Sequence, residues 1–413
     1  MSTVYVTPRG DSYEPVVVEL WSYGGQALGR VGDFEELEFT WSDREAQTCQ
    51  LDVYLDELTA QLLPCDGTVL IVARMNGLTH ITVPVQASAK SGEDPSIGVL
   101  HVVGAGGWTL LDGEVIPPTL EAPVSEQTKP EYHLSGPLED VVKRVVAIGA
   151  ARTGHPIVVV PSVGRGPAVT VHGQWETVSE VCKKLLEHTG FMLTLDGWLP
   201  GDPQPFEDVS LSTPTILADL RSYTDKPGLV WSVDGGDLSD WEVTHKRSTL
   251  NRVVVGNGKD DPAELSIQEM RGQDSGSPWD VREGYKKVDN PAGVGENGPD
   301  AYMIADNLEN QGRAELAAGQ PAVEANIRVD NSAAWEFGTD GVFPRQYQVG
   351  DRGTVILPVL GELTQVITEV TVQLTPDDFT VTPTVSTPDS PRTDIYAQVA
   401  QTTRRVIRLE REK

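Results

Sequence analysis

Alternation of apolar and polar residues marks most of the first hundred positions. In the stretch FEELEFTW, Leu37 and Phe39 share one side, and Glu36, Glu38 and Thr40 share the other. The stretch CQLDVYLDEL alternates in the same way. A period of two predicts strands with one buried face, and frequent Gly, Pro, Val and Thr residues favour short strands joined by tight turns. The first hundred or so residues are therefore predicted to be mainly β.

A different pattern runs from about residue 113 to residue 205. Apolar residues recur at helical spacing after Pro137, and Thr177 and Glu180 form a capping box at the start of a second predicted helix. The stretches HPIVVVP, AVTVHG and FMLTLDGWL flank the two helices as predicted strands. This segment is predicted to form a small α+β module.

The rest of the chain returns to the strand pattern. The stretches WEVTHKRSTLNRVVVGNG and YQVGDRGTVILPVLGELTQVITEVTVQLT predict strands, the second with a hairpin at Leu360 and Gly361. Between them lie a turn-rich stretch from Lys259 to Asp300 and a predicted helix in AYMIADNLENQGRAELAAGQ. The last segment, DIYAQVAQTTRRVIRLEREK, is also predicted to be helical.

Together these patterns predict a mainly β, multidomain chain with an α+β insertion. At 413 residues the chain is long enough for several domains that each bury a core. The expected segments are a first β domain at 1–112, to which 206–228 is a candidate addition, the α+β module at 113–205, a second β domain at 229–325 with a long 259–300 loop and a helix, a C-terminal β domain at 326–390, and a terminal helix at 391–413.

Two segments, 34–55 and 238–257, share a frame of apolar positions. Each begins with alternating residues, continues through a charged loop and ends in a second predicted strand. Any two β-hairpins share such features, so the match is weak by itself. A true repeat would indicate two domains of one type within the chain.

The charge of the chain limits its partners. The 61 acidic residues against 32 basic ones give a formal net charge of -29. An anionic chain repels phosphate, which argues against sequence-specific nucleic-acid binding. The start, MSTVYVTPRG, has no signal-peptide pattern, and the apolar runs are too short to span a bilayer. Cys49, Cys65 and Cys182 are expected to be reduced thiols in a protein made in a cytoplasm.

Candidate catalytic and ligand-binding motifs are few. Ser275 lies in DSG, which resembles the nucleophile loop of chymotrypsin-type proteases, but the surrounding residues are typical of a plain exposed loop. None of the seven histidines stands in the frame of a protease base, and GAGGW is not a nucleotide-binding loop. The chain has no closely spaced set of Cys and His residues, so the sequence predicts no zinc site. We expect a protein without catalytic, cofactor-binding or metal-binding residues, and not an enzyme.

The terminal segment carries a candidate interaction seam. Its positions follow a 4-3-4-3 spacing, and they are Ile395, Val399, Thr402, Val406 and Leu409. Such a seam suits either a short trimeric coiled coil or an amphipathic helix docked on its own domain. The six basic and three acidic residues from Arg392 to Lys413 make a positive segment on a negative chain, which favours docking on an acidic neighbour.

The order of these features resembles a known family. The features are VGDFEELEFTW, VVGAGGWTLLDGEVIPP, TVSEVCKKLLEHTGFML, WEVTHKRSTLNRVVVGNG, YQVGDRGTVILP and ITEVTVQLTPDDFTVTPTVST. In this order, over most of residues 16–387, the chain resembles the tail-hub (baseplate hub) minor tail proteins of long-tailed, siphovirus-type phages that infect actinobacteria. Each motif is loose by itself, and the specificity comes from their succession.

The resemblance implies a structural virion protein at the tail tip. Such hubs are homotrimers with two tube-like β domains per chain, so three chains present six similar domains to the tail tube. The frames at 34–55 and 238–257 would belong to these two domains. Partners would be the distal tail protein, the tape-measure protein and receptor-binding or fibre proteins. DNA would pass through the hub during ejection, and a negatively charged channel would not retain its phosphates.

Two other interpretations stay open from the sequence. One is a tail-associated cell-wall hydrolase with Ser275 or an acidic pair at its centre. The other is an unrelated cytoplasmic β-rich binding protein. A trimeric mass favours the hub, whereas activity on cell-wall material that depends on Ser275 favours the hydrolase.

Overall fold

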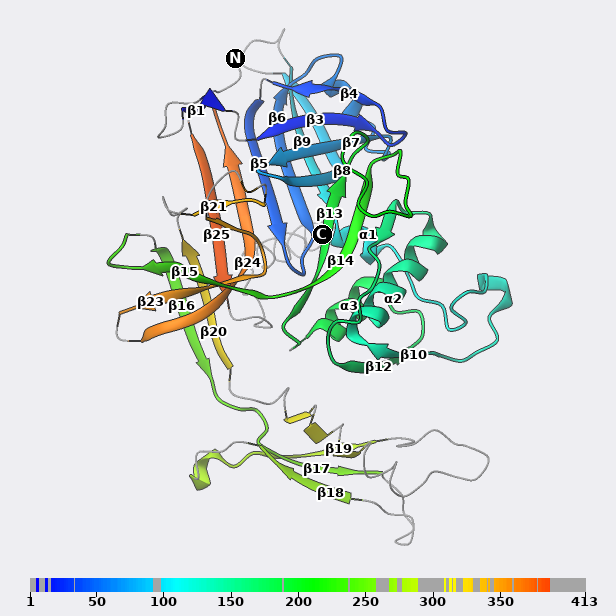
Figure 1. Cartoon of the computed structure of the whole chain (residues 1–413), viewed down its shortest axis with the longest axis vertical. Helices are drawn as coiled ribbons and strands as arrows, with labels where there is room; N and C mark the ends of the chain where they lie inside the picture. The colour runs from blue at the N-terminus through cyan, green and yellow to red at the C-terminus, as the bar shows by residue number, and fades with distance from the viewer. Residues whose placement is uncertain are drawn as a thin grey trace, which may run out of the picture. The chain divides into compact units, whose positions relative to one another are not determined.

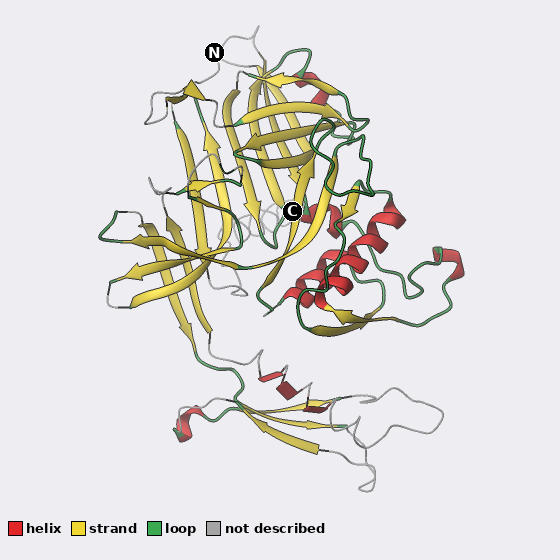
Figure 2. Cartoon of the chain, viewed as in Figure 1, coloured by secondary structure: helices red, strands yellow, loops and turns green. Residues whose placement is uncertain are grey.

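The computed structural model divides the chain into two units. Unit 1 comprises Met1–Trp241 and Asn326–Asp389, and unit 2 comprises Glu242–Ala325 and Ser390–Lys413. The described residues are 5–6, 12–13, 16–32, 34–91, 98–187, 189–236, 238–257, 267–272, 277–288, 308–309, 312–313, 315–316, 322–329, 335–339, 341, 345–358, 360–376 and 378–386. Strands dominate among them (Figure 2), so the chain is mainly β with several sheets, as the alternating pattern predicts.

One large sheet system dominates unit 1 (Figure 1). Its strands follow the order β16-β20-β25-β24-β5-β6-β9-β8-β7-β3-β4, and β23 pairs with both β24 and β15. The strands are β3 (Val17–Ser22), β4 (Ala27–Val31), β5 (Phe34–Ser42), β6 (Gln47–Tyr54), β7 (Val69–Met75), β8 (Leu78–Ser91), β9 (Gly98–Gly106), β15 (Thr224–Ser232), β16 (Leu238–Lys246), β20 (Ala322–Val329), β23 (Asp351–Leu357), β24 (Gly361–Leu374) and β25 (Phe379–Ser386). The expected hairpin at Leu360 and Gly361 is confirmed, since β23 and β24 pair antiparallel on either side of it.

Two long strands change partners along this sheet system. β8 pairs with β7 through its first residues and with β9 from Val83 onward, and its register shifts between Pro84 and Gln86. β24 pairs with β23 through its first residues and with β5 from Glu369 onward, and its pairing with β25 shifts between Ile367 and Glu369. Such irregularities bend a strand. Each long strand therefore passes from one part of the sheet system into the next.

The α+β module lies within unit 1. Its elements are α1 (Trp108–Asp112), β10 (Tyr132–Pro137), α2 (Leu138–Thr153), β11 (Ile157–Val159), β12 (Ala168–Gly173), α3 (Val178–Leu186), β13 (Phe191–Trp198) and β14 (Thr215–Ser222). The predicted capping box of α3 is confirmed, because the Glu180 amide donates to Thr177 Oγ1 at 3.1 Å and the Thr177 amide donates to Glu180 Oε2 at 3.0 Å. α2 ends at Gly154, whose φ of 78° is a left-handed conformation that favours glycine.

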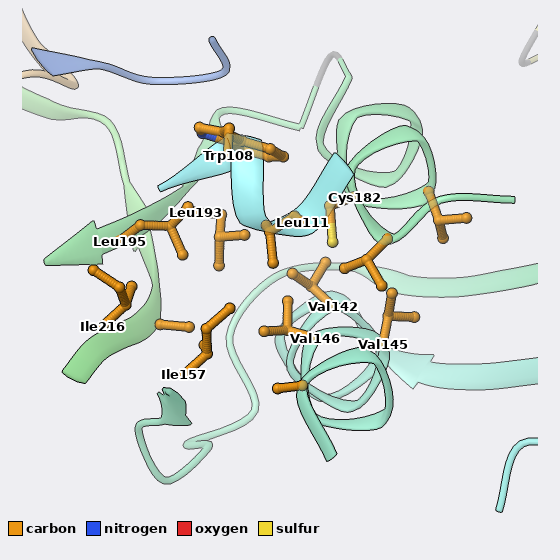
Figure 3. Close-up of a cluster of buried hydrophobic side chains, with 14 of the residues drawn as sticks. Trp108, Leu111, Val142, Val145, Val146, Ile157, Cys182, Leu193, Leu195 and Ile216 are labelled. Carbon is orange, nitrogen blue, oxygen red and sulfur yellow. The ribbon is translucent and has the colours of Figure 1, made fainter. Parts of the chain in front are cut away.

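The module shares its core with the large sheet system. Figure 3 shows Trp108 and Leu111 of α1 beside Val142 of α2 and Leu193 of β13. The same buried cluster includes residues from β3, β7 and β8, namely Trp21, Leu70, Val72 and Ile81. Because helices and strands bury one cluster, the module is part of unit 1 rather than an independent domain.

Unit 1 also contains short elements. They are β1 (Tyr5–Val6), β2 (Ser12–Tyr13), η1 (Thr59–Leu62), η2 (Val124–Glu126), β21 (Glu336–Phe337) and β22 (Gln346–Tyr347). Among the described residues, no helix is long and apolar enough to cross a membrane.

Unit 2 contains a smaller sheet. Its strand order is β18-β17-β19, with β17 at Arg252–Gly256, β18 at Ile267–Arg271 and β19 at Glu283–Lys287, and η3 at Pro278–Asp280 precedes β19. Val253 and Val255 of β17 are buried in one cluster with Leu308 and Leu316. These two leucines are members of the apolar face that the sequence predicts for a helix in this region.

Three expected domain boundaries differ from this division. The 326–390 segment is not a domain of its own, because β24 lies beside β5 in the sheet of unit 1. The 229–325 segment is divided between the units at Trp241. The 259–300 stretch is not only a loop, since it contains β18 and β19. Five-residue strands in a turn-rich stretch are too short to show a clear alternation.

The prediction that 34–55 and 238–257 form a structural repeat is wrong. In the first segment, β5 and β6 pair with each other as an antiparallel hairpin. In the second, β17 pairs with β18 and β19, whereas β16 lies beside β20. A period of two decides which face of a strand is buried, but it does not decide which strand lies beside it. The two frames therefore fold differently.

Candidate functional site

A polar sheet face in unit 1 is the candidate functional site. It belongs to β25, β24, β5, β6 and β9, which are neighbours in the sheet (Figure 1), and no lysine or arginine occurs in these five strands. We call it the polar face, and its members are Thr380, Thr382, Thr384, Glu369, Thr371, Gln373, Glu36, Glu38, Thr40, Thr48, Gln50, Asp52, His101, Val103 and Ala105.

The alternation in the sequence builds this face. Leu37 and Phe39 of β5 are buried, whereas their neighbours Glu38 and Thr40 lie on the other side of the strand and are half-buried. From Glu369 onward, the same alternation places Val370 and Val372 of β24 in the core and Glu369, Thr371 and Gln373 on the polar face. Successive side chains of a strand point to opposite sides of the sheet. One side of the five strands is therefore apolar, and the other is polar.

Threonines form a row across the centre of the face. The register aligns Thr382 of β25 with Thr371 of β24, Thr40 of β5 and Thr48 of β6. Cross-strand threonine pairs stabilise sheets through their β-branched packing and hydroxyl contacts. All four side chains are half-buried. The centre of the polar face is consequently a neutral surface of short side chains.

Carboxylates surround this row. Burial raises the pKa of the Glu38 carboxyl, and the neighbouring carboxylates of Glu36 and Glu369 raise it further. Gln373 Nε2 donates a hydrogen bond to Glu36 Oε1 at 2.7 Å, which links β24 to β5. These five strands carry carboxylates but no lysine or arginine, and basic residues of the adjoining strands stand at the margins, Arg328 opposite Thr384 and Lys90 opposite Val99.

One end of the face carries a histidine beside a carboxylate. His101 Nδ1 and Asp52 Oδ1 are hydrogen-bonded across β9 and β6, and Ser88 of β8 stands opposite His101 in the register. The three residue types are those of a hydrolase triad, which also needs a hydrogen bond between the histidine and the serine. Ser88 and His101, both in the described part of the chain, share no such bond. The row is therefore a cross-strand hydrogen-bonded pair rather than an assembled catalytic group.

Ser275 and the seam of Ile395, Val399, Thr402, Val406 and Leu409 lie outside the described residues. Two tryptophans that could stack on a sugar if they were exposed, Trp198 and Trp335, are buried, with 4% and 8% of their surface exposed. Their indoles belong to the interior and are not displayed for a ligand.

The described histidine side chains occupy unrelated settings. His80 is buried against Phe39 and Trp41, and this burial lowers the pKa of its imidazole to about 4, although the hydrogen bond of Nε2 with the Thr40 carbonyl favours protonation. His155 lies beside a buried glutamate at the end of α2. The remaining described pair, His133 and His172, stack on each other with ring centroids 5.9 Å apart.

A small cavity lies next to the aromatic residues of unit 1. Its volume is about 40 Å³, and residues around it include Trp41, Trp108, Arg221 and Phe337. A cavity of this volume holds roughly one or two water molecules rather than a substrate. Within the described residues, no group of three His, Cys, Asp or Glu side chains is placed to hold a metal ion.

The polar face was missed as a unit by the sequence analysis. The outward positions of Glu36, Glu38 and Thr40 were predicted, but their neighbours at 369–373 and 380–384 come from the far end of the chain. A usable signal is the alternation in TEVTVQL and FTVTPTVS, which combines buried valines with polar residues that are all uncharged or acidic. Pairing these segments with β5 requires the tertiary structure.

Comparison with known proteins supplies the family. The profile of the siphovirus ReqiPepy6 Gp37-like proteins matches residues 17–385, which is most of the chain. The chain belongs to this family. It is accordingly a phage tail protein with a structural role in the virion. No curated protein matches the sequence.

One solved structure of a tail protein shares the fold, and two other tail proteins are similar to this chain. The prophage MuSo2 43 kDa tail protein from Shewanella oneidensis is 14% identical, with a TM-score of 0.52, and the match covers 90% of this chain and 99% of that protein. A tail protein from Neisseria meningitidis MC58 is 13% identical, with a TM-score of 0.49 and coverage of 91% and 97%. Prophage tail protein gp18 from Listeria monocytogenes EGD-e is 12% identical, with a TM-score of 0.49 and coverage of 94% and 99%.

Proposed function

We propose that this protein is the tail hub of a siphovirus-type phage that infects an actinobacterium. It would close the distal end of the tail tube as a homotrimer at the tail tip. Its partners would be the distal tail protein, the tape-measure protein and receptor-binding or fibre proteins. The family supports a role among tail components. The observation that carries the hub role is the polar face, which we assign to the wall of the channel for DNA ejection.

The chemistry of the polar face fits a wall past which DNA slides. Lysine and arginine bind phosphates through charge and release of counterions, and each such contact slows the departure of DNA. The five strands of the face contain neither residue. The carboxylates of Glu36, Glu38 and Glu369 repel phosphates, and the threonine row between them offers no charge. The five strands therefore offer phosphates no lysine or arginine, and the basic neighbours Arg328 and Lys90 stand at the margins of the face.

The proposal does not depend on an internal repeat. The frames at 34–55 and 238–257 fold differently, so they give no support to a ring with six equivalent domains. A ring of three identical chains needs only one heterologous contact repeated around a three-fold axis, and this contact closes without leaving a free interface. The trimer is thus proposed from the family resemblance and the polar face alone.

Lysines placed on the polar face test this proposal. We expect phage particles with Thr40→Lys and Thr371→Lys to release DNA more slowly than wild-type particles, because the new ammonium groups hold phosphates at the centre of the wall. The rate is measured with a DNA-binding dye after receptor addition. The matched control is Thr128→Lys, an exposed position in the α+β module.

Two outcomes would contradict the proposal. Equal DNA-release rates for the polar-face and control particles would show that the polar face does not line the channel. A purified chain that stays monomeric at all concentrations in light scattering would exclude the proposed homotrimer. Antibody labelling of virions in the electron microscope checks the position, and label elsewhere than at the tail tip would exclude a hub.

A further inference from the structure

Two exposed histidines face each other on the two-stranded sheet of the α+β module. β10 and β12 pair antiparallel (Figure 1), and the register places His133 of β10 opposite His172 of β12. The neighbouring residues Tyr132, Leu134 and Val171 are buried, so the two histidines lie on the other, solvent-facing side of the strands. The pair forms no motif in the sequence, because its two members are far apart in the chain.

The imidazole rings of this pair lie side by side. Their centroids are 5.9 Å apart, and their planes are inclined by 29°. A zinc ion binds each imidazole nitrogen at about 2.0–2.1 Å, which places two such nitrogens roughly 3–3.5 Å apart. Facing side chains of an antiparallel pair start from Cβ atoms about 4.5–5.5 Å apart, so rotations about the side-chain bonds bring one nitrogen of each ring to a common ion. The facing positions therefore allow one ion to bridge β10 and β12.

A carboxylate orients one of the two rings. His133 Nε2 donates to Glu131 Oε1 at 3.1 Å in the tautomer that leaves a lone pair on His133 Nδ1. Histidines that bind metal ions commonly donate their second N–H to a carboxylate in this way. The His172 ring makes no hydrogen bond within the described residues. One nitrogen of each ring is therefore available to a shared ligand.

The two strands do not oppose a cation. Neither β10 nor β12 contains a lysine or arginine, and the next facing pair on the same side, Ser135 and Thr170, is neutral. Glu131 adds a negative charge beside the histidines. Imidazole nitrogens suit Zn²⁺, Cu²⁺ and Ni²⁺, whereas Mg²⁺ and Ca²⁺ prefer sets of oxygen ligands. The chemistry of the pair therefore selects a divalent transition ion.

We propose that His133 and His172 bind one Zn²⁺ ion between β10 and β12. Nδ1 of His133 and one nitrogen of His172 are the protein ligands, and water completes the tetrahedral set. Glu131 is a positioning residue, because it holds the His133 ring through Nε2. With two protein ligands, the site differs from the groups of three ligating side chains that the described residues lack.

The ion ties together a part of the module that lacks other strand contacts. Within the described residues, β10 and β12 pair with each other and with no further strand. Two-stranded sheets of this kind are marginally stable by themselves. β10 runs directly into α2 at Leu138, and β12 is followed closely by the capping box of α3 at Thr177. A bound ion therefore stabilises the strands that lead into both helices.

Zinc binding to the purified full-length chain tests this site. In a calorimetric titration with ZnCl₂, we expect the wild type to bind one ion that His133→Ala and His172→Ala each bind at least tenfold more weakly. The matched control is the double variant Ser135→Ala and Thr170→Ala, which removes the next facing pair and should bind zinc as the wild type does. Circular dichroism without zinc checks that each variant folds, and His172→Gln replaces His172→Ala if the latter does not.

Two further readouts separate a metal site from a plain pair of stacked rings. Glu131→Gln should weaken zinc binding severalfold without changing the number of bound ions, because a neutral amide holds the Nε2–H of His133 less strongly than a carboxylate. Zinc should also slow amide hydrogen exchange in β10 and β12 of the wild type. The same addition should leave the exchange of His172→Ala unchanged.

Three outcomes would overturn the proposal. Equal zinc binding by the wild type and His172→Ala would show that the ion lies elsewhere. Weaker binding in only one of the two histidine variants would show that the residues do not share an ion. A rise in molecular mass on adding zinc, seen by light scattering, would place the ion between chains rather than between β10 and β12. The proposal goes beyond the hub function and does not depend on it, because every readout uses the purified chain.

Discussion

The two ends of α2 each contact a buried glutamate, and the surroundings of the two carboxylates differ. At the start of the helix, Glu139 accepts hydrogen bonds from Lys143 Nζ at 2.7 Å, from the Arg165 side chain at 2.7 Å, and from the amides of Arg165 and Val163 at 2.7 and 3.2 Å. Burial by itself raises the pKa of the Glu139 carboxyl, but the hydrogen bonds from Arg165 and Lys143 outweigh burial and hold the pKa far below its usual value.

At the other end, Glu114 has fewer donors. Its Oε1 accepts from Thr153 Oγ1 at 3.2 Å and lies 2.8 Å from His155 Nδ1, whereas its buried Oε2 has no hydrogen-bond partner. Burial raises the pKa of the Glu114 carboxyl, and the contacts with His155, Thr153 and Arg152 only reduce this shift. The dipole of α2 acts in the same sense, since a helix favours negative charge at its start and disfavours it at its end.

The comparison of Glu139 with Glu114 shows that equal burial does not give two carboxylates the same pKa. Both side chains have no exposed surface. What differs is the number of donors, because a buried carboxylate is tolerated as a charge only when hydrogen bonds replace the lost water. Glu139 is expected to be ionised and structural, whereas burial raises the pKa of the Glu114 carboxyl above its usual value.

Removal of Glu139 should give the largest effect. We expect Glu139→Ala to lower the free energy of unfolding by about 3 kcal/mol, because Lys143 and Arg165 are left with Asp219 as their shared carboxylate and the amides of Val163 and Arg165 lose their acceptor. Urea denaturation at pH 7 measures the loss. The control, Asp140→Ala, removes an exposed carboxylate from the same turn and should cost at most about 1 kcal/mol. Equal losses in the two variants would show that the Glu139 network does not stabilise the fold.

The pH dependence of this loss follows from the direction of the pKa shift. A carboxyl whose pKa is lower in the folded chain stabilises the fold above its unfolded value, near 4.5, and this contribution is lost as the pH falls through the folded value. The difference between wild type and Glu139→Ala should therefore shrink toward acidic pH. A difference that stays constant down to strongly acidic conditions would exclude the charge as its source.

Much of the α+β module could be predicted, because its signals are local. The capping box of Thr177 and Glu180, the helical spacing after Pro137 and the polar sides of strands all depend on neighbours within one turn or strand. The carboxylate sites of α2 could not be predicted in this way. Glu139 meets Arg165 from a loop, and Glu114 meets His155 from a segment 41 residues away.

The polar face shows the same limit on a larger scale. The sequence predicts that Glu38 and Thr40 face outward, but the partners of β5 on β24 are more than three hundred residues away, and β25 lies beyond β24. The misassigned repeat has the same origin, since alternation records the buried side of each strand and not its neighbour. Long-range pairing therefore decides both the site and the division into units.

Substitution of Glu114 tests the predicted difference between the two buried carboxylates of α2. A carboxyl with a raised folded pKa stabilises the fold most at low pH, and this contribution is lost as the pH rises from its unfolded value, near 4.5, through the folded one. Glu114→Gln cannot ionise, so its stability relative to wild type should improve as the pH rises from about 4 to 7. The effect should be smaller than that of Glu139→Ala and is measured by thermal unfolding across this range. Glu121→Gln, an exposed carboxyl with 86% of its side chain accessible, is the control and should show no such trend.

The smallest effect concerns a carboxyl with acidic neighbours. Glu38 is half-buried on the polar face, where burial and the carboxylates of Glu36 and Glu369 raise its pKa. We expect Glu38→Gln to stabilise the chain by a few tenths of a kcal/mol at pH 7, because it removes repulsion between facing strands. The gain should fall in 1 M salt, where charges are screened beyond about 3 Å. Glu57→Gln, an exposed loop residue, should change stability in neither condition. A loss of stability in Glu38→Gln would contradict the prediction that the carboxylates of the polar face repel one another and destabilise the fold. A gain in stability that salt does not reduce would contradict it as well.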